Sequence, residues 1–127
     1  MREFRQGHEA GEGAAAVEMA ILLPVLMLLL GGIIDFGFML NAQISLTHAA
    51  REGVRVEAIG ATPPPTPVAA ATAAFTAPAV TGFTAAVTRA CPVANGAQVT
   101  TSATYTPFLL PIGARNLTSQ AVMRCNG

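Results

Sequence analysis

The residue of this chain best suited to act chemically is Glu18, a lone carboxylate near the start of a long apolar segment. It follows Gly13 and three alanines, and from Met19 to Ile34 no residue is charged. A charge placed inside a bilayer costs about 2.5 to 3.5 kcal/mol on insertion scales. Glu18 therefore needs either a partner of opposite charge or a place near the end of a membrane span, at the level of the hydrated headgroups.

The other reactive side chains are Cys91 and Cys125, which lie beyond the apolar segment and have no metal-binding or redox motif around them. Two thiols in an exported domain are expected to form a disulfide. Here it would close a loop of about 35 residues and stabilise the fold by roughly 3 to 4 kcal/mol in the chain-entropy model. The alternative is a pair of unbonded, buried thiols.

No group of residues predicts an enzyme. Ser45 and Ser102 have no motif around them, whereas a nucleophile needs a base and an orienting group within reach. The formal net charge of the 127-residue chain is zero, and its basic residues form no stripe of the kind that binds a nucleic-acid backbone. We therefore expect no catalysis, no cofactor, no metal, no small-molecule substrate and no nucleic-acid partner.

The apolar segment is long enough to cross a membrane. Counted from Ala14 it reaches about 20 residues, the length that spans a hydrocarbon core of roughly 30 Å. We place a transmembrane helix at residues 14–37, because the residues after Ile34 do not form the small-residue site that signal peptidase cleaves. The chain is thus expected to keep this helix as a single membrane span.

The arginines set the orientation of the span. Arg2 and Arg5 precede it, and the next basic residue is Arg51. The positive-inside rule then places the N-terminus in the cytoplasm and the rest of the chain outside it, the compartment in which disulfides form.

An amphipathic pattern extends the helix beyond the membrane over residues 38–60. Its apolar positions are Phe38, Ala42, Ile44, Leu46, Ala49, Ala50, Val54 and Ile59. Glu52 and Arg55 are one turn apart and are expected to pair, and Gly60 is placed to cap the end. A helix from about Ala14 to Ile59 would be about 70 Å long, so its outer half must pack against something.

Proline and glycine interrupt the predicted span. Pro24 lacks an amide hydrogen and crowds the carbonyl of Ala20, so we expect a kink there. Gly31, Gly32 and Gly37 lie around the membrane exit. They are either ordinary residues of a transmembrane helix, or functional residues that allow helices to pack closely or that loosen the region when the subunit leaves the lipid.

A Pro-rich linker at residues 61–67 separates the helix from a small extracytoplasmic domain at residues 68–127. The pattern predicts a short helix at Val68–Ala77 and strands near Phe83–Ala90, Gln98–Tyr105 and Leu117–Arg124. Asn95-Gly96 is a strong hairpin signal between the first two strands. The expected fold class is α+β: a long N-terminal helix, transmembrane and then amphipathic, followed by a small antiparallel sheet.

The segment Phe108–Pro111 is a hydrophobic loop between the last two predicted strands. It is either tucked against the long helix or exposed for a partner. Burial statistics for large apolar side chains favour the first interpretation.

Together these blocks resemble a known family. A glycine followed by a small residue, with glutamate five positions into the mature chain, is similar to the pattern that prepilin peptidases recognise in type IV pilin-like proteins. The chain more specifically resembles the TadE-like family of minor pilins or pseudopilins of tight-adherence (Tad, Flp-type) pilus systems. The matching blocks are Gly13–Ala20, Leu23-Pro24, Asp35–Gly37 and Ala49–Arg55, with a looser likeness at Gln120–Cys125.

The resemblance implies a pilin-like fold and a role in pilus assembly and adhesion. Prepilin peptidase would cleave after Gly13, removing residues 1–13 as a leader and freeing an amine at Ala14 that is largely protonated near neutral pH. In pilin assemblies that amine meets the glutamate of a neighbouring subunit, which would give Glu18 its counter-charge. The implied partners are the peptidase, other pilins or pseudopilins, the Tad inner-membrane platform and the bacterial inner membrane.

Two functions from different classes follow. In the first, the chain is an assembly subunit that is processed and then built into a pilus, or primes one, by helix packing. In the second, it is an uncleaved, single-pass membrane-anchored protein that presents its domain to a partner in secretion or adhesion. The N-terminus of the mature protein distinguishes the two.

Overall fold

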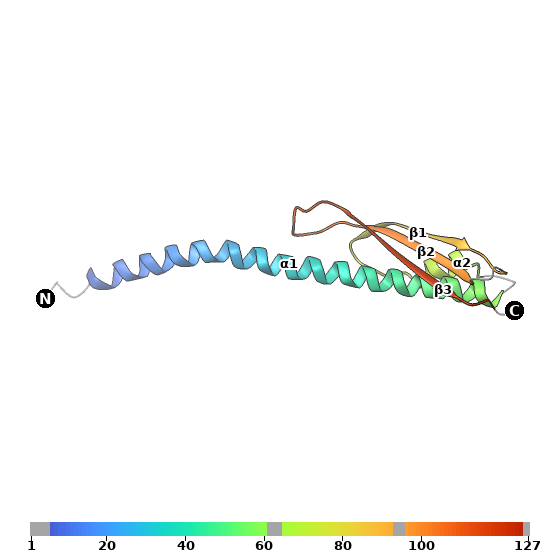
Figure 1. Ribbon diagram of the computed structural model, residues 1–127. Helices are drawn as coiled ribbons and strands as arrows, with labels where there is room; N and C mark the ends of the chain where they lie inside the picture. The colour runs from blue at the N-terminus through green and yellow to red at the C-terminus, as the bar shows by residue number, and fades with distance from the viewer. Residues whose placement is uncertain (1–5, 61–64, 93–95, 126–127) are drawn as a thin grey trace.

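The computed structural model describes residues 6–60, 65–92 and 96–125, with the side chains of the first helix from Gly13 onward. That helix, α1, runs over Gln6–Ile59, which is 54 residues or about 80 Å. Figure 1 shows its N-terminal half projecting alone and its C-terminal half lying along a small domain made of the other elements. This separates a bare helical stem from a packed head.

The helix begins earlier than the sequence predicted. We expected it to start at about Ala14, but it starts at Gln6 and passes through Gly13 without a break. Alanine and glutamate, both good helix formers, lie between the early glycines and favour this extension. Of the predicted leader, residues 1–5 lie outside the part that the structure describes.

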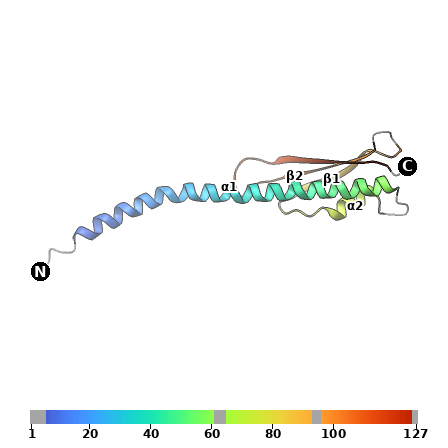
Figure 2. The same cartoon turned by 60° about the horizontal axis from the view of Figure 1, so that its bottom comes forward.

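The stem of α1 is curved. In Figure 2 its N-terminal part bends away from the line of the C-terminal half. Pro24 lies inside the helix in this stem. Because proline cannot donate to the carbonyl one turn earlier and its ring crowds that carbonyl, it accounts for a bend without ending the helix.

The second helix, α2, spans Pro67–Ala74 and packs against α1. Thr66 caps its N-terminus, where the side-chain oxygen accepts a hydrogen bond from the amide of Ala69 at 3.2 Å. The sequence predicted this helix to reach Ala77, but Phe75 is already extended and its ring stacks on Phe83 at a centroid distance of 4.2 Å. That packing contact stabilises the earlier end.

Three antiparallel strands form one sheet in the order β1-β2-β3. They span Val80–Arg89, Ala97–Tyr105 and Arg115–Met123, each beginning one to three residues before the predicted start. The central strand β2 alternates strictly between buried and half-buried residues. The α+β fold, a long apolar helix followed by a small antiparallel sheet, is therefore confirmed.

The connection from β1 to β2 is longer than a two-residue hairpin. Asn95 lies outside the described residues, whereas Gly96 has a positive φ of 80°. A Cβ on Gly96 would lie 2.5 Å from the carbonyl oxygen of Met123 on β3, so glycine is required there. The chain follows β1 with Cys91, which forms a disulfide with Cys125 just after β3, as the sequence predicted.

The core lies where the C-terminal half of α1 meets β2, and α2 covers α1 on another side (Figure 2). Its buried apolar residues are mostly small: Ala42, Leu46, Ala49, Ala50, Val54, Ala58, Ala71, Ala97, Val99, Ala103 and Tyr105. Gly53 is the closest point, because a Cβ there would lie 2.9 Å from the carbonyl oxygen of Pro67 and 3.2 Å from Val99 Cγ1. Small side chains thus let the helix lie directly on both neighbours.

Hydrogen bonds fix the position of the sheet along α1. The buried hydroxyl of Thr101 donates to the carbonyl oxygen of Leu46 at 3.0 Å. The hydroxyls of Thr47 and Ser119 lie 3.0 Å apart, and the amide of Gln43 donates to the carbonyl oxygen of Thr118 at 3.0 Å. These contacts fix the position of β3, and of the loop before it, along the axis of α1.

The predicted amphipathic face is only partly correct. Ile44 and Ile59 were assigned to the buried face but are 70% and 55% exposed, and Phe38 is 37% exposed. Buried positions instead include Ser45, whose hydroxyl accepts the amide of Thr76 at 2.9 Å. The helix is covered from two sides by α2 and the sheet, so a single apolar stripe does not describe its buried surface.

The end of α1 follows the prediction. Gly60 has a positive φ of 65°, as a helix-capping glycine does, and its amide donates to the carbonyl oxygen of Glu57 at 3.2 Å.

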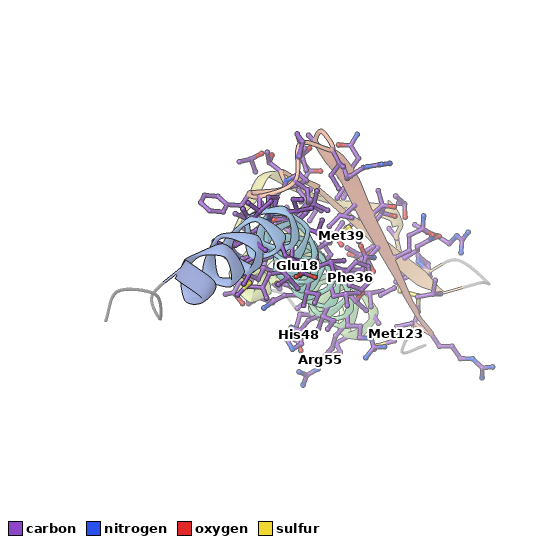
Figure 3. All side chains as sticks on the ribbon, turned by 90° about the vertical axis from the view of Figure 1, so that its left-hand side faces the viewer. Glu18, Phe36, Met39, His48, Arg55 and Met123 are labelled. Carbon is purple, nitrogen blue, oxygen red and sulfur yellow. A yellow bond between two sulfur atoms is a disulfide. The ribbon has the colours of Figure 1, made fainter. Side chains whose placement is uncertain are left out.

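The predicted pairing of Glu52 with Arg55 is present as an ion pair at 3.8 Å. Figure 3, a view along α1, shows Arg55 and His48 extending from the side of the helix away from β3.

Candidate membrane-anchoring and assembly site

The stem of α1 exposes an almost unbroken apolar surface. The large side chains between Val17 and Ile34 are 40% to 72% exposed. Among the described residues, α1 is the one helix that is long and apolar enough to cross a membrane. Exposed apolar surface of this extent is unfavourable in water. The stem is therefore suited to lipid or to contact with other apolar helices.

The predicted processing residues lie at the far end of this stem. Gly13, Ala14 and Glu18 are all exposed, and nothing lies within 4 Å of a Cβ built on Gly13. Figure 3 labels Glu18 on the stem, ahead of the head. The described side chains give Glu18 no ion-pair partner, so the chain leaves its carboxylate free for a group from another molecule or from water.

A second carboxylate, Asp35, lies where the stem meets the head, and it is nearly fully buried. Its two oxygens accept three backbone amides of the β2–β3 loop: Phe108 at 2.9 Å, Leu109 at 3.0 Å and Leu110 at 2.7 Å. Hydrogen bonds from amides to an ionised group are among the stronger ones in proteins. Asp35 therefore ties the loop to the last turn of the apolar stem.

Tyr105 completes this junction. It is the last residue of β2, it is fully buried, and its hydroxyl donates to the backbone carbonyl oxygen of Asp35 at 2.8 Å. Burial raises the pKa of the Tyr105 hydroxyl, and the neighbouring Asp35 carboxylate raises it further. The hydroxyl thus stays protonated and keeps donating to the helix.

The glycines of the membrane exit divide into two groups. A Cβ on Gly31 would lie 3.3 Å from the Cβ of Leu109, and one on Gly32 would lie 3.9 Å from Leu110. Within the described chain, Gly31 therefore makes room for Leu109 of the β2–β3 loop, whereas Gly32 leaves an ordinary contact with Leu110. Packing of these two glycines against a neighbouring helix stays a prediction. Gly37 has open space around it, so packing against a neighbouring helix stays a prediction for that residue.

The hydrophobic loop is only half tucked in, contrary to the interpretation we favoured. Its backbone and one side of Leu109 face α1, but Phe108 is 82% exposed and Ile112 is 54% exposed. The reason is that Asp35 draws the amides inward, which turns apolar side chains outward. The loop thus contacts the helix and also presents an exposed apolar tip.

The sequence did not predict that Asp35 binds the β2–β3 loop or that Gly53 is a close contact of α1 with α2 and β2. Both were noted only as parts of blocks shared with a family. Asp35 had a recognisable signal, because it is the first charged residue after the span and a carboxylate at that point needs donors. Nothing local to the sequence indicates that those donors come from residues 108–110.

Stem, junction and head define a class of protein: a long apolar helix that fits a single-pass membrane anchor, with a small α+β head built onto its C-terminal half. Residues 13–55 match the family model described as TadE-like protein, so over this segment the chain is identified as TadE-like, in agreement with the sequence blocks. The matched range covers the apolar stem, Asp35 and the helix face that carries the head. Comparison with curated proteins and with solved structures found no match.

The chain is thus similar to TadE-like proteins over residues 13–55, which lie in a helix long and apolar enough to serve as a membrane anchor. The family range ends at Arg55 and includes none of the sheet. The part of the molecule that matches the family model is therefore the helix.

Proposed function

We propose that this protein is a minor pilin or pseudopilin of a Tad-type (Flp) pilus, held in the bacterial inner membrane with its N-terminus in the cytoplasm. Prepilin peptidase cleaves it after Gly13, and the mature subunit, beginning at Ala14, takes part in pilus assembly and adhesion through other pilins and the Tad platform. The role is structural and involves no catalysis.

The observation that carries this proposal is the bare stem of α1. Apolar side chains of the stem are exposed on every side, including Ile21 at 68%, Leu28 at 64% and Ile33 at 72%. A helix that is apolar all round is suited to lipid in one state and to packing among other helices in another. A subunit that moves from a membrane into a filament needs this surface in both places.

Glu18 gives the transfer its specificity. Its carboxylate has no ion-pair partner among the described side chains, and it lies on the same stem that would be buried in an assembly. A protonated amine at Ala14 of a neighbouring subunit supplies an opposite charge once the leader is removed. Processing would thus create the group that makes burial of Glu18 favourable.

Mass spectrometry of the N-terminus tests the proposal. Protein from a membrane fraction and from sheared filaments is compared in cells with and without the peptidase. Chains beginning at Ala14, found only when the peptidase is present, support the proposal. An intact Met1 in cells that carry the peptidase contradicts it.

One observation favours the second function, an uncleaved anchored binding protein. The helix α1 is continuous through Gly13 from Gln6, so part of the predicted leader and the stem form a single element. In that case the head is presented to a secretion or adhesion partner from a permanent anchor. The same measurement separates the two functions, because the anchor retains its leader.

A further inference from the structure

The β2–β3 loop reaches back along α1 toward the stem. Figure 1 shows this loop, between the ends of β2 and β3, as the part of the head nearest to the N-terminal half of the helix. Leu109 lies against Gly31, one turn inside the end of the apolar segment. Along the helix axis Gly31 is about 27 Å from Gly13, within the roughly 30 Å of a hydrocarbon core.

The composition of the loop continues the apolar surface of the stem. From Thr106 to Ala114 no residue is charged. Phe108, Leu109 and Ile112 are 82%, 49% and 54% exposed, and the stem side chains from Leu28 to Leu30, just before the Gly31 that Leu109 contacts, are 57% to 64% exposed. Arg115 follows immediately as the first residue of β3 and is exposed. An apolar tip followed by an arginine suits the boundary between lipid tails and phosphates, where a long basic side chain reaches the headgroups.

The backbone of the loop is also prepared for lipid. An irregular loop is excluded from hydrocarbon because its N–H and C=O groups would lose their hydrogen bonds to water, and in this loop the N–H groups are bonded within the chain. Here the amides of Phe108, Leu109 and Leu110 all donate to Asp35. The amide of Thr106 donates to the carbonyl oxygen of Ala79, and that of Ile112 donates to Leu110. The two remaining residues, Pro107 and Pro111, have no amide hydrogen.

We propose that the β2–β3 loop inserts its tip, Phe108 to Ile112, into the outer leaflet of the membrane that α1 spans. The occupant of this apolar surface is the bilayer, because the surface is continuous with the stem, lies at its outer end and has every amide from Thr106 to Ile112 accounted for. Asp35 makes the insertion possible, since it accepts the amides that water would otherwise bind. The head is then held against the membrane by two attachments and not by the stem alone.

The inference rests on the membrane anchoring of α1 and not on processing or filament assembly. Its test uses the full chain reconstituted in lipid nanodiscs at one copy per disc. The chain has no tryptophan, so a single substitution gives an unambiguous fluorescence signal. Three variants are compared: Phe108→Trp at the loop tip, Leu26→Trp in the stem, and Val122→Trp on β3, whose side chain is 59% exposed.

In discs with brominated phosphatidylcholine, Phe108→Trp should lose most of its emission and should emit at a shorter wavelength than Val122→Trp, which should be unaffected by bromine. The emission of Leu26→Trp should also be quenched, which would show that the stem is inserted in the bilayer. Quenching of Leu26→Trp without quenching of Phe108→Trp overturns the loop insertion and leaves the anchor intact. Absence of quenching in both overturns the anchor and with it this inference.

Two controls make the outcomes decisive. Thiol labelling confirms that each variant keeps the disulfide, so that a misfolded head is recognised. The second control compares discs that hold one copy with discs that hold several. If the emission of Phe108→Trp moves to shorter wavelength without quenching, and does so only with several copies per disc, a second chain covers the tip and the proposal is wrong.

Discussion

The two carboxylates at the ends of the stem, Glu18 and Asp35, differ in how their charge is compensated. Asp35 is 3% exposed and accepts three amides from its own chain, so its charge is compensated internally. Glu18 is exposed, and the described side chains offer it no ion-pair partner. Burial of a charge that has no hydrogen-bond donors or counter-charge is costly. Asp35 has its donors within the chain, whereas Glu18 needs a donor or a positive charge from another molecule if it is to be buried.

Replacing Asp35 with Asn tests its role in holding the loop. The variant keeps the shape of the side chain but loses the charge and an acceptor oxygen, so the free energy of unfolding should fall by about 1 to 3 kcal/mol. The amides of Phe108, Leu109 and Leu110 should exchange with solvent faster, measured by hydrogen exchange in micelles. Glu52→Gln, a surface change in the same helix, is the control. Equal protection in both variants would show that the loop is held by side-chain packing alone.

Tyr105 gives a pH dependence that is measurable without a label. It is the only tyrosine, and the chain has no tryptophan, so the ultraviolet absorbance of tyrosinate reports this residue alone. Because the pKa of Tyr105 is raised in the folded state, its contribution to stability is complete below the ordinary value near 10 and is lost as pH rises through the folded pKa.

The titration midpoint of Tyr105 should therefore lie above that of the denatured chain. Removing the neighbouring charge in Asp35→Asn should bring the midpoint back toward the ordinary value. A native midpoint equal to the denatured one would contradict the buried donor that the structure shows.

At the scale of elements, the head depends on how closely α1 approaches its two neighbours. Ala49, Ala50 and Gly53 are buried, and none of them has a side chain larger than a methyl group. Gly53 lies against Pro67 and Ala71 of α2 and against Val99 of β2. Such small residues allow backbone and side-chain atoms to come within van der Waals contact. At Gly53 this close approach leaves no room for an added methyl group.

Gly53→Ala and Gly37→Ala form a matched pair in one helix. At Gly53 the new methyl group would meet the carbonyl oxygen of Pro67 at 2.9 Å and the Cβ of Ala71 at 3.1 Å, so overpacking should cost about 1 to 3 kcal/mol. At Gly37 nothing lies within 4 Å, so the gain in helix propensity should stabilise the chain by up to about 1 kcal/mol. Thermal unfolding followed by Tyr105 fluorescence compares the two. Equal melting temperatures would mean that α2 moves aside freely.

At the scale of the whole molecule, stem and head are built for different surroundings. Figures 1 and 2 both show the head confined to the C-terminal half of α1, with nothing covering the stem. The disulfide between Cys91 and Cys125 joins the chain just after β1 to the chain just after β3 and so secures the head. The stem relies for its stability on lipid or on other helices.

Glu18→Ala is the test of the stem at this scale. Removing an uncompensated charge should leave insertion unchanged or make it easier, because a carboxylate inside a span costs free energy. Pilus assembly should fall strongly, because the partner of the neighbouring amine is lost. Sheared filaments and membrane-bound protein are measured in the same cells, with Glu52→Ala as the control. Normal piliation in Glu18→Ala would count against the proposed subunit role.

The sequence determined the features that depend on local chemistry and length. The apolar run of about 20 residues from Ala14 predicts a span, Gly60 predicts the end of α1, and alternation along β2 and β3 predicts the sheet. Hydrophobic periodicity and capping act over a few residues, so they can be read from the chain directly. The closely matching family blocks, from Gly13 to Arg55, all lie in α1.

Only the tertiary structure decided which distant residues meet. The three amides on Asp35 come from 73 to 75 positions further along the chain, and Gly53 is confined by residues of α2 and β2. Such contacts depend on how the sheet is placed against the helix, which Thr101 and Ser119 fix through hydrogen bonds to α1. No local pattern encodes that placement, because its stabilising contacts form only when both partners are already folded.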